Sequence, residues 1–266
     1  MEVHEFGEKT NPKIVLIPGN LMTWRQFEDL IPLLSDDYYV IAISTDGYDG
    51  NGTTTFTTAQ ASADHLAAYL REKHDGRIDL VFGESMGCAT ALMLFHWQKV
   101  HVESMILNGA QNMDLGPLNS LLKKSIPKGQ YKMARQFQES GDTGDFPLMA
   151  KLFIRQDEDK MKKMVRHAAK NISLESIQNA TSEALSLFRT LSTYEPVPDA
   201  HVGFWHGSKE PNIKSAWKII QQVYPLAQEL AFEGFGHGEV MAHPDMLAKE
   251  IRRFMNGSHS RQPRRN

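Results

Sequence analysis

Short apolar runs alternate with helical patterns along most of the chain, and this alternation restricts the fold more than any other feature. Six runs rich in β-branched and aliphatic residues have the length of buried strands: residues 14–17, 38–43, 78–82, 102–107, 202–205 and 226–232. Between them, apolar residues three and four positions apart predict covering helices: 24–34, 58–74, 85–98, 213–224 and 244–255. Continuously apolar strands are typical of a sheet buried on both faces. The sequence therefore predicts an α/β fold with a mostly parallel central sheet flanked by helices.

The alternation is interrupted by residues 112–198, which contain several helical patterns and no clear strand. We expect a helical insertion, acting as a lid, that divides an α/β core into residues 1–111 and 199–256. Residues 257–266 are polar and basic with nothing to bury, which predicts a disordered tail. Apolar side chains of the insertion are expected to pack between helices, or else to line a pocket for an apolar group: Met133, Phe137, Met149, Phe153 and Phe188.

Composition excludes several classes of partner. The 29 Lys and Arg residues are balanced by 32 Asp and Glu residues, so no excess positive charge favours nucleic acid or an anionic membrane. The longest apolar stretch, 88–97, is far shorter than the roughly 20 residues that cross a bilayer, so no stable membrane insertion is expected. The single cysteine, Cys88, has no partner for an internal disulfide, and no signal-peptide pattern precedes the first strand. These features predict a cytoplasmic protein.

One pentapeptide carries the strongest chemical signal. Gly83-Glu84-Ser85-Met86-Gly87 matches G-x-S-x-G, and it follows an apolar strand and precedes a helix, as that motif requires. A sharp strand-to-helix turn needs small flanking residues while its serine is held in a strained conformation. The turn therefore predicts an exposed hydroxyl at a helix N-terminus, where unpaired N–H groups favour developing negative charge.

In this motif the chain resembles the α/β-hydrolase superfamily, and the resemblance extends over nearly its whole length. Residues 14–20 look like the strand and loop that supply an oxyanion donor, although Pro18 stands where many relatives carry histidine. Residues 206–211 follow a late strand, where family members place the triad acid, and residues 234–238 follow the last strand, where they place the catalytic histidine. The resemblance implies Ser85 as nucleophile, Glu210 as acid and His237 as general base, in the chain order of this fold.

Two further assignments follow from the same resemblance. The backbone N–H groups of Met86 and Asn20 would form the oxyanion hole, with Leu21 as the second choice for the latter. Some relatives place the acid after an earlier strand, where Asp114 is the alternative to Glu210. His243 is the nearby rival of His237, but it precedes Pro244, a residue suited to the first position of a helix.

No cofactor or metal is expected. The other histidines, including His65, His96 and His206, accompany neither an H-E-x-x-H motif nor a pair of cysteines. We expect a serine hydrolase that cleaves a small or medium carboxylic ester through an acyl-enzyme; thioesters or activated amides would use the same groups. A ligand-binding receptor and a non-hydrolytic lyase on the same fold are the alternatives.

Overall fold

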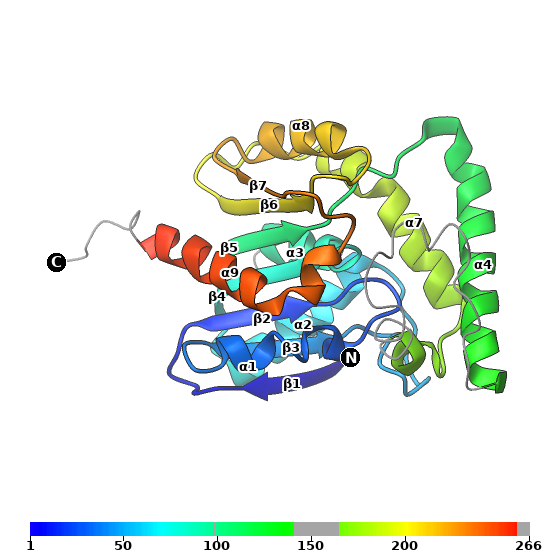
Figure 1. Cartoon of the computed structure of the whole chain (residues 1–266), viewed down its shortest axis with the longest axis horizontal. Helices are drawn as coiled ribbons and strands as arrows, with labels where there is room; N and C mark the ends of the chain where they lie inside the picture. Colours follow the sequence, from blue (N-terminus) through cyan, green and yellow to red (C-terminus); the bar gives the residue numbers. More distant parts are fainter. Residues whose placement is uncertain (98, 141–164, 260–266) are drawn as a thin grey trace.

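The computed structural model describes residues 1–97, 99–140 and 165–259, and a seven-stranded sheet forms the centre of this part of the chain (Figure 1). The strands are β1 (Glu2–Phe6), β2 (Lys13–Ile17), β3 (Tyr39–Ser44), β4 (Arg77–Glu84), β5 (His101–Asn108), β6 (His201–Gly207) and β7 (Gln228–Phe232). They lie in the order β1-β3-β2-β4-β5-β6-β7, with β1 antiparallel to β3 and the other neighbours parallel. The predicted α/β fold with a mostly parallel sheet is confirmed.

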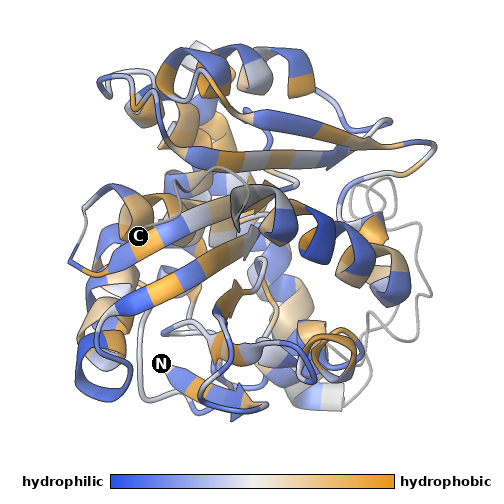
Figure 2. Ribbon diagram, turned by 90° about the vertical axis from the view of Figure 1, so that its left-hand side faces the viewer, coloured by the Kyte–Doolittle hydropathy of each residue, from blue (hydrophilic) through white to orange (hydrophobic). Residues whose placement is uncertain are grey.

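Helices bury both faces of the sheet. Successive side chains of a strand point to opposite faces, so Val15 and Ile17 of β2 join one core cluster while Ile14 and Leu16 join the other. The first face is covered by α2 (Ala59–Lys73), α3 (Gly87–His96) and α8 (Ile213–Val223). The second is covered by η1 (Trp24–Phe27), α1 (Ile31–Leu34) and α9 (Pro244–His259). Figure 2 shows apolar and polar positions together along these helices, as expected where only one side of a helix is buried.

A helical insertion connects β5 to β6. Its described elements are η2 (Gly116–Leu118), α4 (Asn119–Ser140) and α7 (Leu174–Leu191), and α4 and α7 lie side by side at one end of the sheet in Figure 1. Met133 of α4 and Phe188 of α7 are buried in apolar clusters, which agrees with the expectation that they pack between helices. The side chain of Phe137 and residues Met149 and Phe153 lie outside the described part.

The structure adds one strand that was not predicted and corrects two expectations. The antiparallel edge strand β1 was not predicted, because its five residues are all only half-buried and form no apolar run. The single helix expected over 24–34 is wrong: η1 ends at Phe27, and α1 begins at Ile31 with Pro32 in its first turn. Proline lacks an N–H and its ring collides with the carbonyl four residues earlier, so it begins a helix better than it continues one. Finally, α9 continues to His259, so residues 257–259 are helical; the rest of the expected tail, 260–266, lies outside the described residues.

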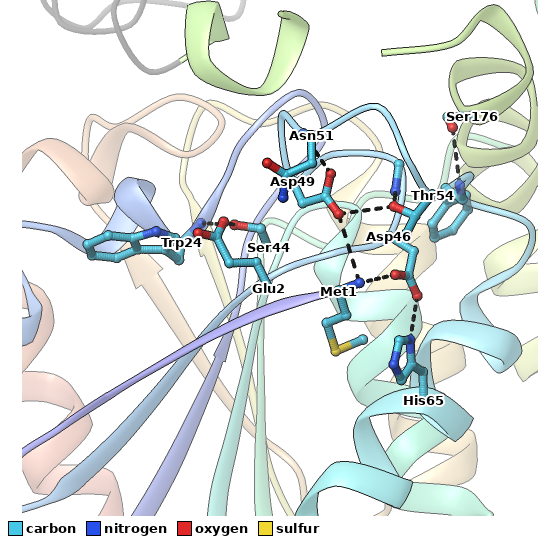
Figure 3. Close-up of polar contacts among 12 residues, drawn as sticks. Met1, Glu2, Trp24, Ser44, Asp46, Asp49, Asn51, Thr54, His65 and Ser176 are labelled. Atoms are coloured by element: carbon cyan, nitrogen blue, oxygen red, sulfur yellow. Dashed lines mark hydrogen bonds and ion pairs between the residues drawn. The ribbon is translucent and has the colours of Figure 1, made fainter. Parts of the chain in front are cut away.

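The loop after β3 is held by charges from the start of the chain (Figure 3). The amino group of Met1 pairs with Asp46, and Asp46 Oδ2 lies 2.8 Å from His65 Nδ1 on α2. On its other side the loop contacts α7, because Ser176 Oγ accepts from the backbone N–H of Phe56 over 3.1 Å. These contacts fix the loop between the sheet and the insertion.

No helix in the described ranges is long and apolar enough to cross a membrane.

Candidate active site

Ser85 lies at the sharp turn between β4 and α3. Its φ of 51° is in the left-handed region, which is costly for a residue with a side chain. Two hydrogen bonds hold the turn: the N–H of Ser85 donates to Asn108 O over 2.8 Å, and its carbonyl accepts from Cys88 N over 3.1 Å. At Gly87 a methyl group would lie 2.4 Å from Ile17 O, so only glycine lets α3 begin this close to β2. The motif therefore forms the strained elbow that its sequence predicts.

Three side chains from three loops form one chain of hydrogen bonds. Ser85 Oγ lies 2.9 Å from His237 Nε2, and His237 Nδ1 lies 2.9 Å from Glu210 Oε2. The other carboxylate oxygen of Glu210 accepts from the N–H of Gly207 over 2.7 Å, which fixes the carboxylate below the imidazole. With Nδ1 donating to Glu210, Nε2 is left to accept the proton of the serine hydroxyl. The geometry suits general-base activation of an alcohol nucleophile.

The electrostatics of the pair favour a charged imidazole. Burial alone would lower the pKa of His237, but the hydrogen bond and charge of Glu210, with a contribution from the charge of Glu84, raise it above its usual value. For Glu210, burial would raise the pKa, but hydrogen bonds from His237, the N–H of Gly207 and Gln111 lower it below its usual value. Glu210 therefore stays ionised and stabilises the imidazolium that forms when His237 accepts a proton.

The alternative candidates lie elsewhere. Asp114 accepts two hydrogen bonds from Arg189 at Oδ2, over 2.9 and 2.7 Å, and one from Asn119 at Oδ1. It is Glu210, rather than Asp114, that the structure brings to His237. His243 stacks on Phe235 with ring centroids 4.8 Å apart.

The three other histidines named from the sequence each have a partner: His65 contacts Asp46, His96 contacts Tyr224, and His206 contacts Glu229. Within the described residues, no group of three or more His, Cys, Asp or Glu side chains is arranged to hold a metal ion.

The two expected oxyanion donors belong to segments next to the serine. Met86 follows Ser85 at the start of α3, and neither its backbone N–H nor that of Asn20 donates to another described residue. The loop of Asn20 passes beside the nucleophile, since a methyl group at Gly19 would lie 3.4 Å from Ser85 Cβ. Leu21, the second choice, has a φ of 58°. N–H groups near a nucleophile that no described residue occupies are of the kind that stabilises an oxyanion.

Two residues in contact with the site were not predicted. Gln111 Nε2 donates to Glu210 Oε2 over 2.7 Å and lies 3.2 Å from His237 Nδ1. Glu84, the second residue of the G-x-S-x-G motif, is only 1% exposed and accepts a hydrogen bond from Asn108 Nδ2. A charged residue inside an otherwise small and apolar turn was the available signal for Glu84; nothing in the sequence marks Gln111.

The insertion contacts residues next to Ser85 in the chain or in space. Met86 and Leu21 share a core cluster with Met133 of α4 and with Ala169 and Ile172, and Asn20 Nδ2 donates to Gln130 Oε1 over 3.3 Å. A separate cavity of about 800 Å³ lies between α4 and residues 165–173, and its lining includes Tyr131, Arg135, Arg166, His167 and Lys170. Among the described residues that line it are none of Ser85, His237 and Glu210.

Known proteins with similar structures span several activities. MenH from S. aureus matches with a TM-score of 0.72 and 18% identity, covering 97% of this chain and 98% of its own. A carboxylesterase structure from the Thaumarchaeon Nitrososphaera gargenis matches with 0.71 and 16% identity, covering 97% and 95%. A mutant of epoxide hydrolase from Solanum tuberosum matches with 0.69 and 15% identity, covering 96% and 95%. At these identities the likeness shows the fold.

A search of curated protein sequences gives no match. The family model for the alpha/beta hydrolase fold, in contrast, matches residues 12–238, a range that contains Ser85, Glu210 and His237. That range covers most of the chain and the whole of β2 to β7. The chain therefore belongs to the α/β-hydrolase fold family.

Proposed function

We propose that the protein is a serine hydrolase that cleaves a small or medium carboxylic ester through an acyl-enzyme. The observation that carries this proposal is the chain from Ser85 Oγ through His237 to Glu210, with two contacts of 2.9 Å. Ser85 Oγ forms a bond to the acyl carbon while His237 Nε2 accepts its proton. His237 then gives that proton to the leaving alcohol as the ester C–O bond breaks. Water, activated by the same imidazole, releases the acid.

The N–H groups of Met86 and Asn20 would hold the negative charge of the tetrahedral intermediates. Such a donor is worth about 100- to 1,000-fold in rate. Thioesters and activated amides need the same nucleophile, base and donors and are substrates of the same proposal. Epoxide hydrolases and carboxylesterases are both among the structural neighbours, and a serine beside a histidine base favours the acyl-enzyme chemistry of an ester hydrolase.

We also propose that residues 112–198 form a cap over a hydrolase core made of residues 1–111 and 199–256. Support comes from the contacts of Met133 and Gln130 of α4 with residues beside Ser85. Because the cap covers the nucleophile, its side chains would select the size of the acyl or alcohol group.

The test combines covalent labelling with turnover. A fluorophosphonate probe is expected to label the parent and to leave Ser85→Ala unlabelled. With p-nitrophenyl esters of rising acyl length as substrates, kcat of Ser85→Ala should be lower than that of the parent by on the order of a million-fold. Labelling without turnover of any ester or thioester would favour a receptor. Turnover of a substrate by elimination, without an acyl-Ser85 species in mass spectra of quenched reactions, would favour a lyase. Equal hydrolysis by parent and Ser85→Ala would refute the assignment of the nucleophile.

A further inference from the structure

Glu84 is a buried carboxyl group that the proposed reaction does not use. It ends β4 immediately before Ser85, and its side chain points into the protein, with 1% exposure. Asn108, at the end of the neighbouring strand β5, donates a hydrogen bond from Nδ2 to Glu84 Oε2. Burial of an ionised carboxyl group costs free energy unless hydrogen bonds or opposite charges stabilise it. The groups around Glu84 therefore indicate which interaction its charge can serve.

Two glycines show how close this carboxyl is to the imidazole. A methyl group at Gly109 would lie 3.0 Å from His237 Cε1 and 3.5 Å from Glu84 Oε1. The distance between His237 Cε1 and Glu84 Oε1 is therefore at most about 6.5 Å. A methyl group at Gly238, the residue after the histidine, would lie 3.1 Å from the same Oε1. Because both positions are glycine, neither carries a side chain that could separate the carboxylate of Glu84 from the imidazole of His237. Glu84 faces His237 from the elbow, whereas Glu210 contacts Nδ1 from the loop after β6.

We propose that Glu84 is a positioning residue that acts on the reaction through His237, as a second carboxylate whose ionisation raises the basicity of the imidazole and stabilises its protonated form. An opposite charge at this distance favours the charged form of histidine. The role in turnover rests on the proposed hydrolase function, whereas the effect on the ionisation of His237 does not.

The charged and titratable neighbours of Glu84 are few. From the loop after β7 it faces His237, from the loop after β6 Glu210, and from α3 Cys88. Its uncharged neighbours are Asn108 at the end of β5, Gly109 directly after β5 and Gly19 in the loop after β2. Burial raises the pKa of Glu84 to about 7, although His237 and Asn108 act to lower it and Glu210 adds to the rise. The charges of Glu84 and His237 act on each other, so the ionisation of one changes the pKa of the other. A proton on Glu84 removes a charge that favours the imidazolium, so the two protonations oppose each other.

The direct test follows the C2–H of His237, the proton on Cε1, by NMR from about pH 5 to about pH 9, with His237→Gln to assign the signal. In Glu84→Gln the pKa of His237 is expected to fall by about one pH unit or more, since one nearby anion is lost. Glu84→Asp keeps the charge and is expected to restore most of the parent value. Glu8→Gln is the matched control, because it removes an exposed carboxylate at the opposite end of the sheet, and it should leave the titration unchanged. An equal pKa in the parent and Glu84→Gln would overturn the proposal.

The parent alone gives a second test, which does not require the variant to fold. Its His237 signal should report two ionisations, its own and that of Glu84, so its titration curve should depart from that of a single proton. A single, simple ionisation would also overturn the proposal. These titrations need no substrate, so absence of esterase activity would refute the proposed function without affecting this result.

Where turnover is measured, the acid limb of kcat/KM against pH should move to lower pH in Glu84→Gln, and the plateau should fall about tenfold because the imidazolium is less stabilised. A merely structural role would lower activity at every pH without moving the limb, and that result would count against the proposal.

Discussion

Replacement of Glu84 by glutamine is expected to stabilise the folded protein at neutral and alkaline pH. Burial raises the pKa of Glu84 from 4.5 to about 7, against the opposing effects of His237 and Asn108. In the unfolded chain this carboxyl ionises near its usual value, so between these two values the folded state binds more protons. The free energy of unfolding of the parent therefore contains a contribution that is fully present below about pH 4.5 and is lost as the pH rises through about 7.

The size of this loss follows from the same difference in pKa. Each pKa unit corresponds to about 1.4 kcal/mol, so the loss is about 3 kcal/mol and is complete by about pH 8. Glutamine has nearly the same shape and keeps an oxygen that can accept from Asn108, but it carries no charge to bury. Relative to Glu84→Gln, the parent should lose stability as the pH rises.

Urea unfolding of the two proteins at half-unit intervals from about pH 4.5 to about pH 8.5 measures this difference. The free energy of unfolding of the parent minus that of Glu84→Gln should fall by about 3 kcal/mol across the series. Glu8→Gln is the control and should show no such trend. A difference that stays constant within about 0.5 kcal/mol, or that changes in the opposite direction, would show that Glu84 is not held at a raised pKa.

Two further replacements, each with its matched control, test the site and the elbow. Glu210→Gln should lower kcat/KM for a p-nitrophenyl ester about a thousandfold or more, because the imidazolium loses its charged partner. The kcat/KM of Asp114→Asn should stay within about threefold of the parent value. The reverse order of the two effects would assign the acid to Asp114. Gly87→Ala should lower the free energy of unfolding by more than about 3 kcal/mol, because its methyl group would collide with Ile17 O. In the control, Gly129→Ala in α4, no atom lies within 4 Å of the added methyl group. This control should leave the free energy of unfolding unchanged or raise it by about 0.5–1 kcal/mol. Thermal unfolding of both alanine variants checks this, and equal stability would refute the close approach at Gly87.

The parallel strands and the elbow could be predicted from the sequence because each depends on a local pattern. Continuous apolar runs mark β2 to β6, and the G-x-S-x-G motif between strand and helix marks the turn of Ser85. The edge strand β1 could not be found in this way, because it is half-buried and pairs with only one neighbour, β3. The break within 24–34 depended on Pro32, whose effect a purely periodic interpretation overlooks.

The site was less accessible, because its contacts join distant parts of the chain. The sequence left Glu210 and Asp114 as alternatives, and the partner that occupies Asp114 is Arg189, 75 residues further along. Gln111 meets Glu210 across 99 residues, so no local pattern predicts it. The catalytic roles of Ser85, His237 and Glu210 stay a prediction until the labelling and turnover measurements are made.

The connection from β5 to β6 has a consequence for how such a protein diversifies. Although about a hundred residues separate the two strands in the chain, they are hydrogen-bonded neighbours, with Ser104 opposite His201 and Asn108 opposite Trp205. The two strands are parallel, so the insertion leaves at the carboxyl end of β5 and re-enters at the amino end of β6, at the opposite edge of the sheet. Their register is fixed by the hydrogen bonds between them, whatever the insertion contains. Its length and sequence can therefore change without altering the register of the strands that carry the elbow and the acid. If the insertion is the proposed cap, its sequence can vary between relatives while the strands that position Ser85 and Glu210 stay the same.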